Sequence, residues 1–425
     1  MEEMSLAVYS ILIFAGIYFF IVTEKINKAV AALLGAFLTI ITGIVPQHEA
    51  FTKYIDFNTI FFLIGMMMIV GIVKETGLFE YLAVKAVHIS KGRPIVIMLI
   101  ISVITAFFSA FLDNVTTIML MMPVMLYIAD ELKMSPIPIT IAVIFSSNIG
   151  GTATLIGDPP NILIGSQTGL SFMAFVSNLA GIAIVILVVA LLIFTLLYRN
   201  SLGSSRQDIA GVMVEGDSPI KDKKLLVKSL IVLAAAIAGF MLHDTLGLES
   251  ATISMLAAAV LIIISKAKPQ KVFEEIEWDT IFFFIGLFII VGGLEETHVI
   301  DKLAELMMKA TKGQPMVTAI SILWLSAIVS AFLDNIPFTA AMIPVIKIAA
   351  EMSAMNTEPL WWALALGACL GGNGTAIGAS ANVVAIGMLN EAGGRLSFKD
   401  YFKVGFPLML VSIVIATIYI VLRYF

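Results

Sequence analysis

A four-residue motif, Phe-Leu-Asp-Asn, occurs twice in this chain, at residues 111–114 and at 332–335. The two copies are 221 positions apart (334 minus 113), and each lies inside a long apolar run. A carboxylate at membrane depth is costly, so an ionisable residue there indicates a functional role. The same acid at the same place in two apolar runs predicts an internally duplicated membrane protein.

The composition supports this class of protein. Of 425 residues, 60% are hydrophobic and only 13% are charged, and the mean hydropathy is +1.03. Soluble domains carry about a quarter charged residues, so the chain is expected to be an all-α polytopic membrane protein. No cleavable signal peptide is evident, and residues 6–22 are predicted to be a retained first span.

The apolar segments repeat with the same offset. Spans are predicted at about 5–23, 28–45, 57–73, 138–165 and 172–197, and again at 225–242, 249–265, 279–294, 360–390 and 403–423. Residues 1–197 therefore form a first repeat, 198–224 a polar linker and 225–425 a second repeat.

Two apolar arms joined by the Asp-Asn tip precede the fourth span of each repeat, at about 95–130 and 316–351. Each arm is expected to reach only about 24 Å at 1.5 Å per residue. That is short for a crossing, so we interpret the arms as re-entrant helical hairpins. Five crossings per repeat is an odd number, which predicts two inverted repeats.

The distribution of basic residues orients the chain. Nineteen Lys and Arg residues fall on the side of the linker and six on the side of the termini. The positive-inside rule therefore predicts a cytoplasmic linker and both termini outside, in a bacterial or archaeal inner membrane.

A span broken by small residues follows each hairpin. The first break reads Asn-Ile-Gly-Gly-Thr-Ala-Thr from 148 and Gly-Asp-Pro-Pro-Asn from 157, and the second reads Cys-Leu-Gly-Gly-Asn-Gly-Thr from 369 and Gly-Ala-Ser-Ala-Asn from 378. Paired glycines and prolines interrupt a helix. Unwound backbone frees carbonyls that can coordinate a small cation, so the breaks and the hairpin tips are expected to form one central site.

These motifs resemble the ion transporter superfamily, which holds the arsenite permeases (ArsB), the NhaD-type sodium/proton antiporters, the P protein and the divalent-anion/sodium symporters. The segments 24–28 and 31–36 and the two Leu-Asp-Asn tips are similar to the P-protein and arsenite-permease branch. In the symporters the tips carry Ser-Asn-Thr, which binds sodium and a substrate carboxylate. Here aspartate replaces the serine and the first threonine is lost.

The candidate site follows from the motifs and the resemblance. Asp113, Asp334 and Asp158 are proposed to bind protons or a cation, because carboxyl groups in apolar surroundings hold protons more readily than in water. Substrate is expected to contact two groups of residues. The first repeat supplies Asn114, Thr116, Thr117, Gly150, Gly151, Thr152, Thr154 and Asn161, and the second supplies Asn335, Thr339, Gly371, Gly372, Asn373, Thr375 and Asn382.

Each acid also has a simpler interpretation. Asp113 and Asp334 each precede a helical arm, where aspartate is a favoured N-cap. Asp158 stands before two prolines, an even better cap position. Cys369, the one cysteine of the chain, is better explained as a small buried side chain than as an arsenic ligand.

The charges near the tips limit the classes of substrate. No arginine or lysine lies near either tip in the sequence, so two aspartates would repel a dicarboxylate. The sequence therefore favours proton-coupled efflux of arsenite or antimonite, whose hydroxides are neutral near pH 7. A sodium/proton antiporter is the alternative, and a channel or a receptor is a further class.

No motif of an enzyme, a cofactor site or a nucleic-acid partner is recognised. The resemblance allows a homodimer and, for arsenite permeases, a soluble ATPase subunit.

Overall fold

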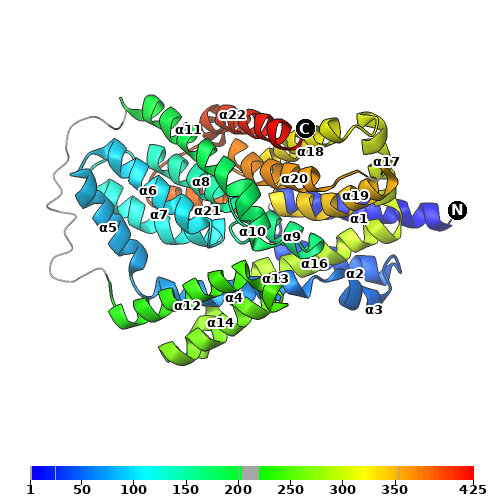
Figure 1. The fold of residues 1–425 in the computed structure, drawn as a ribbon, viewed down its shortest axis with the longest axis horizontal. Coiled ribbons are helices and arrows are strands. Elements are labelled where there is room, and N and C mark those ends of the chain that lie inside the picture. The colour runs from blue at the N-terminus through cyan, green and yellow to red at the C-terminus, as the bar shows by residue number, and fades with distance from the viewer. Residues whose placement is uncertain (1, 24, 201, 203–219, 354) are drawn as a thin grey trace.

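A computed structural model describes the chain except residues 1, 24, 201, 203–219 and 354 (Figure 1). It is 82% helical, and the described residues contain no strand. The predicted all-α class is confirmed. The predicted linker, 198–224, lies largely outside the described residues.

In its described residues the first repeat contains eleven α-helices and two π-helical turns. They are α1 (Glu2–Thr23), α2 (Lys28–Ile41), α3 (Gln47–Glu49), η1 (Ala50–Tyr54), α4 (Phe57–Lys74), α5 (Leu78–Ser90), α6 (Pro94–Ser109), α7 (Asn114–Glu131), α8 (Pro136–Thr152), α9 (Pro159–Thr168), α10 (Phe172–Phe175), η2 (Val176–Ala180) and α11 (Gly181–Tyr198).

The second repeat follows the same order with fewer interruptions. Its elements are α12 (Lys223–Met241), α13 (His243–Leu246), α14 (Ser250–Ser265), α15 (Pro269–Glu274), α16 (Trp278–Glu296), α17 (Val299–Thr311), α18 (Pro315–Phe332), α19 (Asn335–Ser353), α20 (Glu358–Gly371), the 3₁₀ turn η4 (Gly372–Gly374), α21 (Ser380–Glu391) and α22 (Phe398–Tyr424).

Local sequence signals set many of these boundaries. The side chain of Asn27 accepts hydrogen bonds from the first amides of α2, and Asp56 and Asp222 do the same for α4 and α12. Lys91 and Lys312, which the repeat aligns, both end their helices in the left-handed region and are both followed by a glycine. The duplication is therefore visible in the caps as well as in the spans.

Seven helices of the described residues are long and apolar enough to cross a membrane. Among them are α18 and α19, with 18 and 19 residues, so the arms of the second hairpin are longer than the 24 Å that the sequence analysis expected. The arms of the first hairpin, α6 and α7, have 16 and 18 residues. The re-entrant placement of both hairpins stays a prediction.

The hairpins occupy opposite ends of the longest axis, with α6 and α7 at one end and α18 and α19 at the other (Figure 1). Between them α8 and α20 approach the middle of the molecule and pack against each other. The chain leaves the helical conformation after Thr152 and resumes it at Pro159, and the second break lies between Gly374 and Ser380. This arrangement brings both breaks and both tips toward one region.

Glycines let these elements approach closely. A Cβ on Gly150 would collide with the backbone of Ala106, and one on Gly371 would lie 2.6 Å from the Ala327 carbonyl oxygen. Gly151 and Gly372 approach the far side of each break in the same way, at the carbonyl oxygens of Gly157 and Gly378. These four predicted site residues therefore pack backbone against backbone.

Candidate functional site

The two hairpin tips begin the helices α7 and α19. The Asp113 carboxylate accepts hydrogen bonds from the amide of Thr116, at 2.8 Å, and from its hydroxyl, at 2.6 Å. Asp334 accepts from the amide of Ile336, at 3.2 Å, and from the Ser380 hydroxyl, at 2.9 Å. Both acids therefore bond the first turn of a helix, and both also line cavities.

Asp158 does not cap the helix that follows it. It is fully buried, and its carboxylate bonds no amide of α9. Instead its Oδ1 accepts a hydrogen bond from the Asn335 amide nitrogen at 3.2 Å. The cap interpretation of Asp158 is wrong, because the chain turns this side chain away from α9 and across to the tip of the second hairpin.

A chain of buried asparagines joins the two repeats. The amide nitrogen of Asn114 lies 3.2 Å from the Asn148 side-chain oxygen, and the Asn148 nitrogen donates at 3.0 Å to both Asn373 and Asn382. All four side chains are buried. Asn148 was not among the predicted site residues, although it begins the motif that predicted the first break.

Asparagines also satisfy the carbonyls that the breaks set free. Asn161 donates at 2.8–3.3 Å to the carbonyls of three residues, which are Gly151, Thr152 and Thr154. Its repeat partner Asn382 donates to Gly372 and Thr375 at 2.7 and 2.8 Å. These carbonyls, expected as cation ligands, already have internal donors.

The predicted threonines hold the same framework. Thr154 and Thr375 donate to the Ala110 and Ala331 carbonyls at the ends of the hairpin arms. Thr152 and Thr339 bond their own helices through the carbonyls of Asn148 and Asn335. The Thr117 hydroxyl is buried and has no hydrogen-bond partner among the described residues.

Cys369 is completely buried, with its Sγ 3.6 Å from the Asn161 side-chain oxygen. Within the described part of the chain no three His, Cys, Asp or Glu residues are grouped as a metal site. The contacts of Cys369 agree with a packed side chain that occupies the repeat position of Asn148.

A cavity of about 470 Å³ lies between the two tips and the start of α16. Four of its lining residues were predicted: Asp113, Asn114, Asp158 and Asn335. Its other polar lining residues were not, and they are Lys28, Glu277, Asp279, Thr280 and Ser380. Asp334 lines an adjoining cavity of about 340 Å³, which shares Lys28 and Ser380 with the first.

The expectation that no lysine lies near a tip is wrong. The Lys28 ammonium nitrogen is 3.8 Å from Asp334 Oδ2 and 2.9 Å from the Ser380 hydroxyl. The sequence separates Lys28 from the second tip by most of the chain, and packing of the two repeats brings them together. Glu277 could have been found, since it aligns with Asp56 before the third span of each repeat.

The start of α16, which lines this central cavity, lies on the side where the linker ends. Near the start of α16, Lys74 pairs with Glu275 at 2.9 Å. The Lys221 amide, just beyond the linker, bonds the Thr76 carbonyl at 3.0 Å. Under the predicted topology this side is cytoplasmic.

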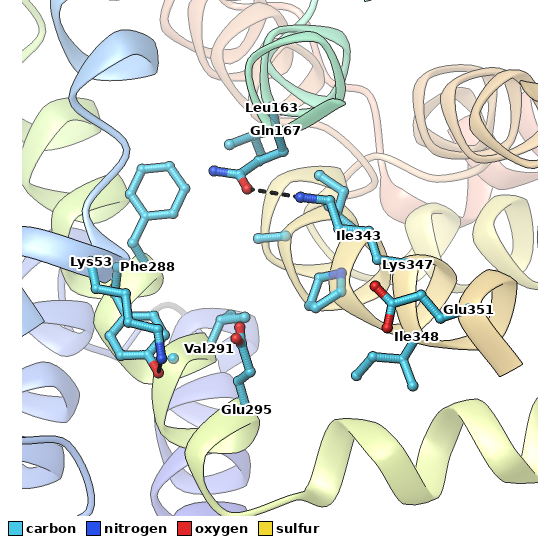
Figure 2. Close-up of a pocket in the computed structure, with 14 residues that line it drawn as sticks. Lys53, Leu163, Gln167, Phe288, Val291, Glu295, Ile343, Lys347, Ile348 and Glu351 are labelled. Carbon is cyan, nitrogen blue, oxygen red and sulfur yellow. Dashed lines mark hydrogen bonds between the residues drawn. The ribbon is translucent and has the colours of Figure 1, made fainter. Parts of the chain in front are cut away.

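A second cavity, of about 420 Å³, lies near η1 and the ends of α9 and α16 (Figure 2). Figure 2 shows Lys347 of α19 reaching Gln167 of α9, with 3.4 Å between the nitrogen and oxygen. Lys53 also lines this cavity, and the hydrogen bond that its ammonium group donates to Glu296 raises the pKa of Lys53 above its ordinary value. None of the three predicted acids lines this cavity.

The long apolar helices of the described residues, packed around cavities with polar linings, define a multi-pass membrane protein. The family model described as Citrate transporter, CitMHS, matches residues 18–367, and the chain belongs to this family. It is 40% identical over 99% of both chains to the uncharacterized transporter Rv2684 of Mycobacterium tuberculosis.

The P protein of Homo sapiens is 33% identical to this chain over 97% of its residues. The chain spans only 59% of the length of that relative. The predicted likeness to the P protein is confirmed.

Two solved transporters share the fold. The YdaH transporter of Alcanivorax borkumensis matches with a TM-score of 0.61 at 15% identity, over 92% of this chain and 89% of its own. MtrF of Neisseria gonorrhoeae, from a class of antimetabolite efflux pumps, matches with a TM-score of 0.62 at 12% identity, over 91% and 84%. At these identities the likeness concerns the fold alone.

Proposed function

We propose that this protein is a secondary active transporter that couples proton movement to a small cation or a neutral polar solute. The observation that carries the proposal is the lining of the central cavity. Four carboxyl side chains and one lysine face it, together with the amides of Asn114 and Asn335. Such a lining attracts cations and protons and repels anions.

Sodium is the substrate that this lining supports best. Sodium is a hard cation, and carboxylate, amide and hydroxyl oxygens are the ligands that hard cations prefer. Exchange of sodium for protons would use the same carboxyl groups for both ions. The sodium/proton antiporter, the alternative from the sequence, is therefore our first candidate.

Export of arsenite or antimonite in exchange for protons is the second candidate. Their neutral hydroxides are not repelled by the acids and can bond the asparagine and serine groups of the cavity. A thiol site for arsenic has little support, because Cys369 is buried and does not line the cavity. Citrate, named in the family description, carries several negative charges and matches this acidic lining poorly.

Proteoliposomes containing the purified protein and an internal pH indicator test the proposal. A sodium pulse is expected to make the lumen alkaline if sodium enters as protons leave. Arsenite and citrate pulses run in parallel. Proton movement with citrate alone, or with none of the three, would overturn the proposal, and movement with arsenite alone would favour the second candidate.

A further inference from the structure

Lys28 links two parts of the molecule through the wall of the central cavity. It is the first residue of α2, which packs on α16, whereas Asp334 and Ser380 belong to the second hairpin and the second broken helix. The side chains of Lys28 and Asp334 are 30% and 13% exposed, and the ammonium also lies 5.4 Å from the centre of the Phe283 ring. The ion pair is thus mostly shielded from water.

The position of Lys28 is unfavourable for a lysine by itself. The first turn of a helix carries the positive end of the helix dipole, which repels a cation. Asp334 offsets this repulsion. A lysine at this position therefore indicates a role in binding the acid rather than in forming α2.

The two tips differ in this respect. Asp113 has no ion pair within the described ranges, and the position that the repeat aligns with Lys28 is Glu249. Among the described residues, only the acid of the second tip therefore forms an ion pair. A transported cation that approaches Asp334 must compete with the ammonium group for the same oxygens.

We propose that Lys28 is the resident counter-ion of Asp334 and is displaced when a proton or the transported cation binds there. This inference rests on the proposed function. While Asp334 is ionised and no proton or transported cation is bound to it, its ion pair with Lys28 connects the tip of the second hairpin to α2. Binding of a proton or a cation at Asp334 breaks this ion pair. Lys28 thereby sets the affinity for the cation and links its binding to movement of the tip.

Several titratable groups share this environment and would contribute to any pH profile. The groups on the elements packed around Lys28 and Asp334 are Tyr18, Asp113, Asp158, Glu277 and Asp279. The test therefore compares variants of Lys28 in an otherwise unchanged chain.

Sodium-driven proton flux is measured in proteoliposomes with Lys28→Gln, which can still donate to Ser380. Loss of the competing charge is expected to lower the KM for sodium about five- to tenfold. The pH of half-maximal flux is expected to rise, because an ammonium group no longer opposes protonation of the cavity. Lys28→Arg should keep the wild-type values. Lys25→Gln should keep them too, because Lys25 lines neither the central cavity nor the adjoining cavity.

The double variant separates competition from a structural effect. Because Asp334→Asn is expected to lose proton-coupled flux, this comparison uses sodium binding. If Lys28 acts through Asp334, adding Lys28→Gln to Asp334→Asn does not change the sodium concentration that gives half-maximal thermal stabilisation of Asp334→Asn alone. Arsenite, a neutral solute, should show no change in KM with Lys28→Gln. An unchanged KM and pH profile in Lys28→Gln, with normal wild-type transport, would overturn the role of Lys28 and leave the proposed function standing.

A binding measurement tests the role of Lys28 if the wild-type protein shows no transport. If wild-type protein moves neither sodium nor arsenite, the proposed function fails, and sodium is titrated against the unfolding temperature of the purified full-length protein. Lys28→Gln must then lower the sodium concentration that gives half-maximal stabilisation. Equal midpoints in the two proteins, or no stabilisation by sodium in either, would overturn the proposal.

Discussion

Asp113 combines two roles that one substitution can separate. Its carboxylate caps α7 through Thr116, and it also lines the central cavity. Asparagine caps a helix about as well as aspartate but carries no exchangeable charge. Asp113→Asn is therefore expected to fold normally and to lose proton-coupled flux in proteoliposomes.

Unfolding temperature and gel filtration of the same Asp113→Asn preparation are the controls for folding. Asp334→Asn is expected to behave in the same way, although it also frees Lys28. Full pH-dependent flux in both variants would rule out the proposed role of the two acids.

Asn161 has a structural role that is equally specific. Its amide nitrogen donates hydrogen bonds to three carbonyl groups that the first break leaves without helical partners. Water cannot easily replace these hydrogen bonds, because the side chain is fully buried. Asn161→Ala should lower the free energy of unfolding by about 2–4 kcal/mol, since buried acceptors are left unpaired.

Asn161→Asp replaces the donor with acceptor oxygens of nearly the same size and should destabilise the protein further. Thermal unfolding in detergent ranks the three proteins. Wild-type stability in Asn161→Asp would show that these hydrogen bonds contribute nothing.

The elements of the two repeats are not packed equally well. In the second repeat, Phe402 and Phe406 of α22 pack on Phe332 at the end of the hairpin arm, with ring centres 6.4 and 6.1 Å apart. The Leu-Ser-Phe segments at 170–172 and 396–398 align the start of α10 with the start of α22. In this alignment Val176 and Ala180 of the first repeat correspond to Phe402 and Phe406. An apolar groove of about 490 Å³ lies there, next to Phe107 and Phe111.

Filling this groove should stabilise the protein. Ala180→Phe is expected to raise the free energy of unfolding by roughly 1 kcal/mol through added van der Waals packing against the groove. Val188→Phe, at an exposed position of α11 outside the groove, is the matched control and should have little effect. Thermal unfolding in one detergent compares them, and a lower stability of Ala180→Phe would mean that the groove cannot accept the ring.

The order of the elements could be predicted from the sequence because its signals are local and occur twice. The Asp-Asn tips, the glycine pairs and the apolar runs marked the hairpins and the breaks. Lys28 could not be placed at Asp334 in this way, because their contact depends on how α2 packs beside the second repeat. The hydrogen bonds that Asn161 donates were also missed. A sequence shows which carbonyl groups a break frees, but it does not show which side chain donates hydrogen bonds to them.

At the scale of the whole molecule, the repeats build a similar joint at each end of α4 and α16. Gly71 of α4 packs against the Glu275 side chain, and Gly292, its repeat partner on α16, packs against the Tyr54 ring. Each joint is reinforced by an ion pair, between Lys74 and Glu275 on one side and between Lys53 and Glu296 on the other. The central cavity lies beside the first joint and the cavity of Figure 2 beside the second.

These two cavities allow the predicted orientation to be tested with single cysteines. Gln167 and Asp279 are exposed and line the cavity of Figure 2 and the central cavity, respectively. The native Cys369 is fully buried and should react slowly. If both termini are outside, Gln167→Cys in intact cells should react with a membrane-impermeant maleimide, whereas Asp279→Cys should react only in inside-out vesicles. The reverse pattern would invert the topology and place the central cavity on the outer side, and equal labelling of both cysteines from one side would contradict two cavities on opposite faces.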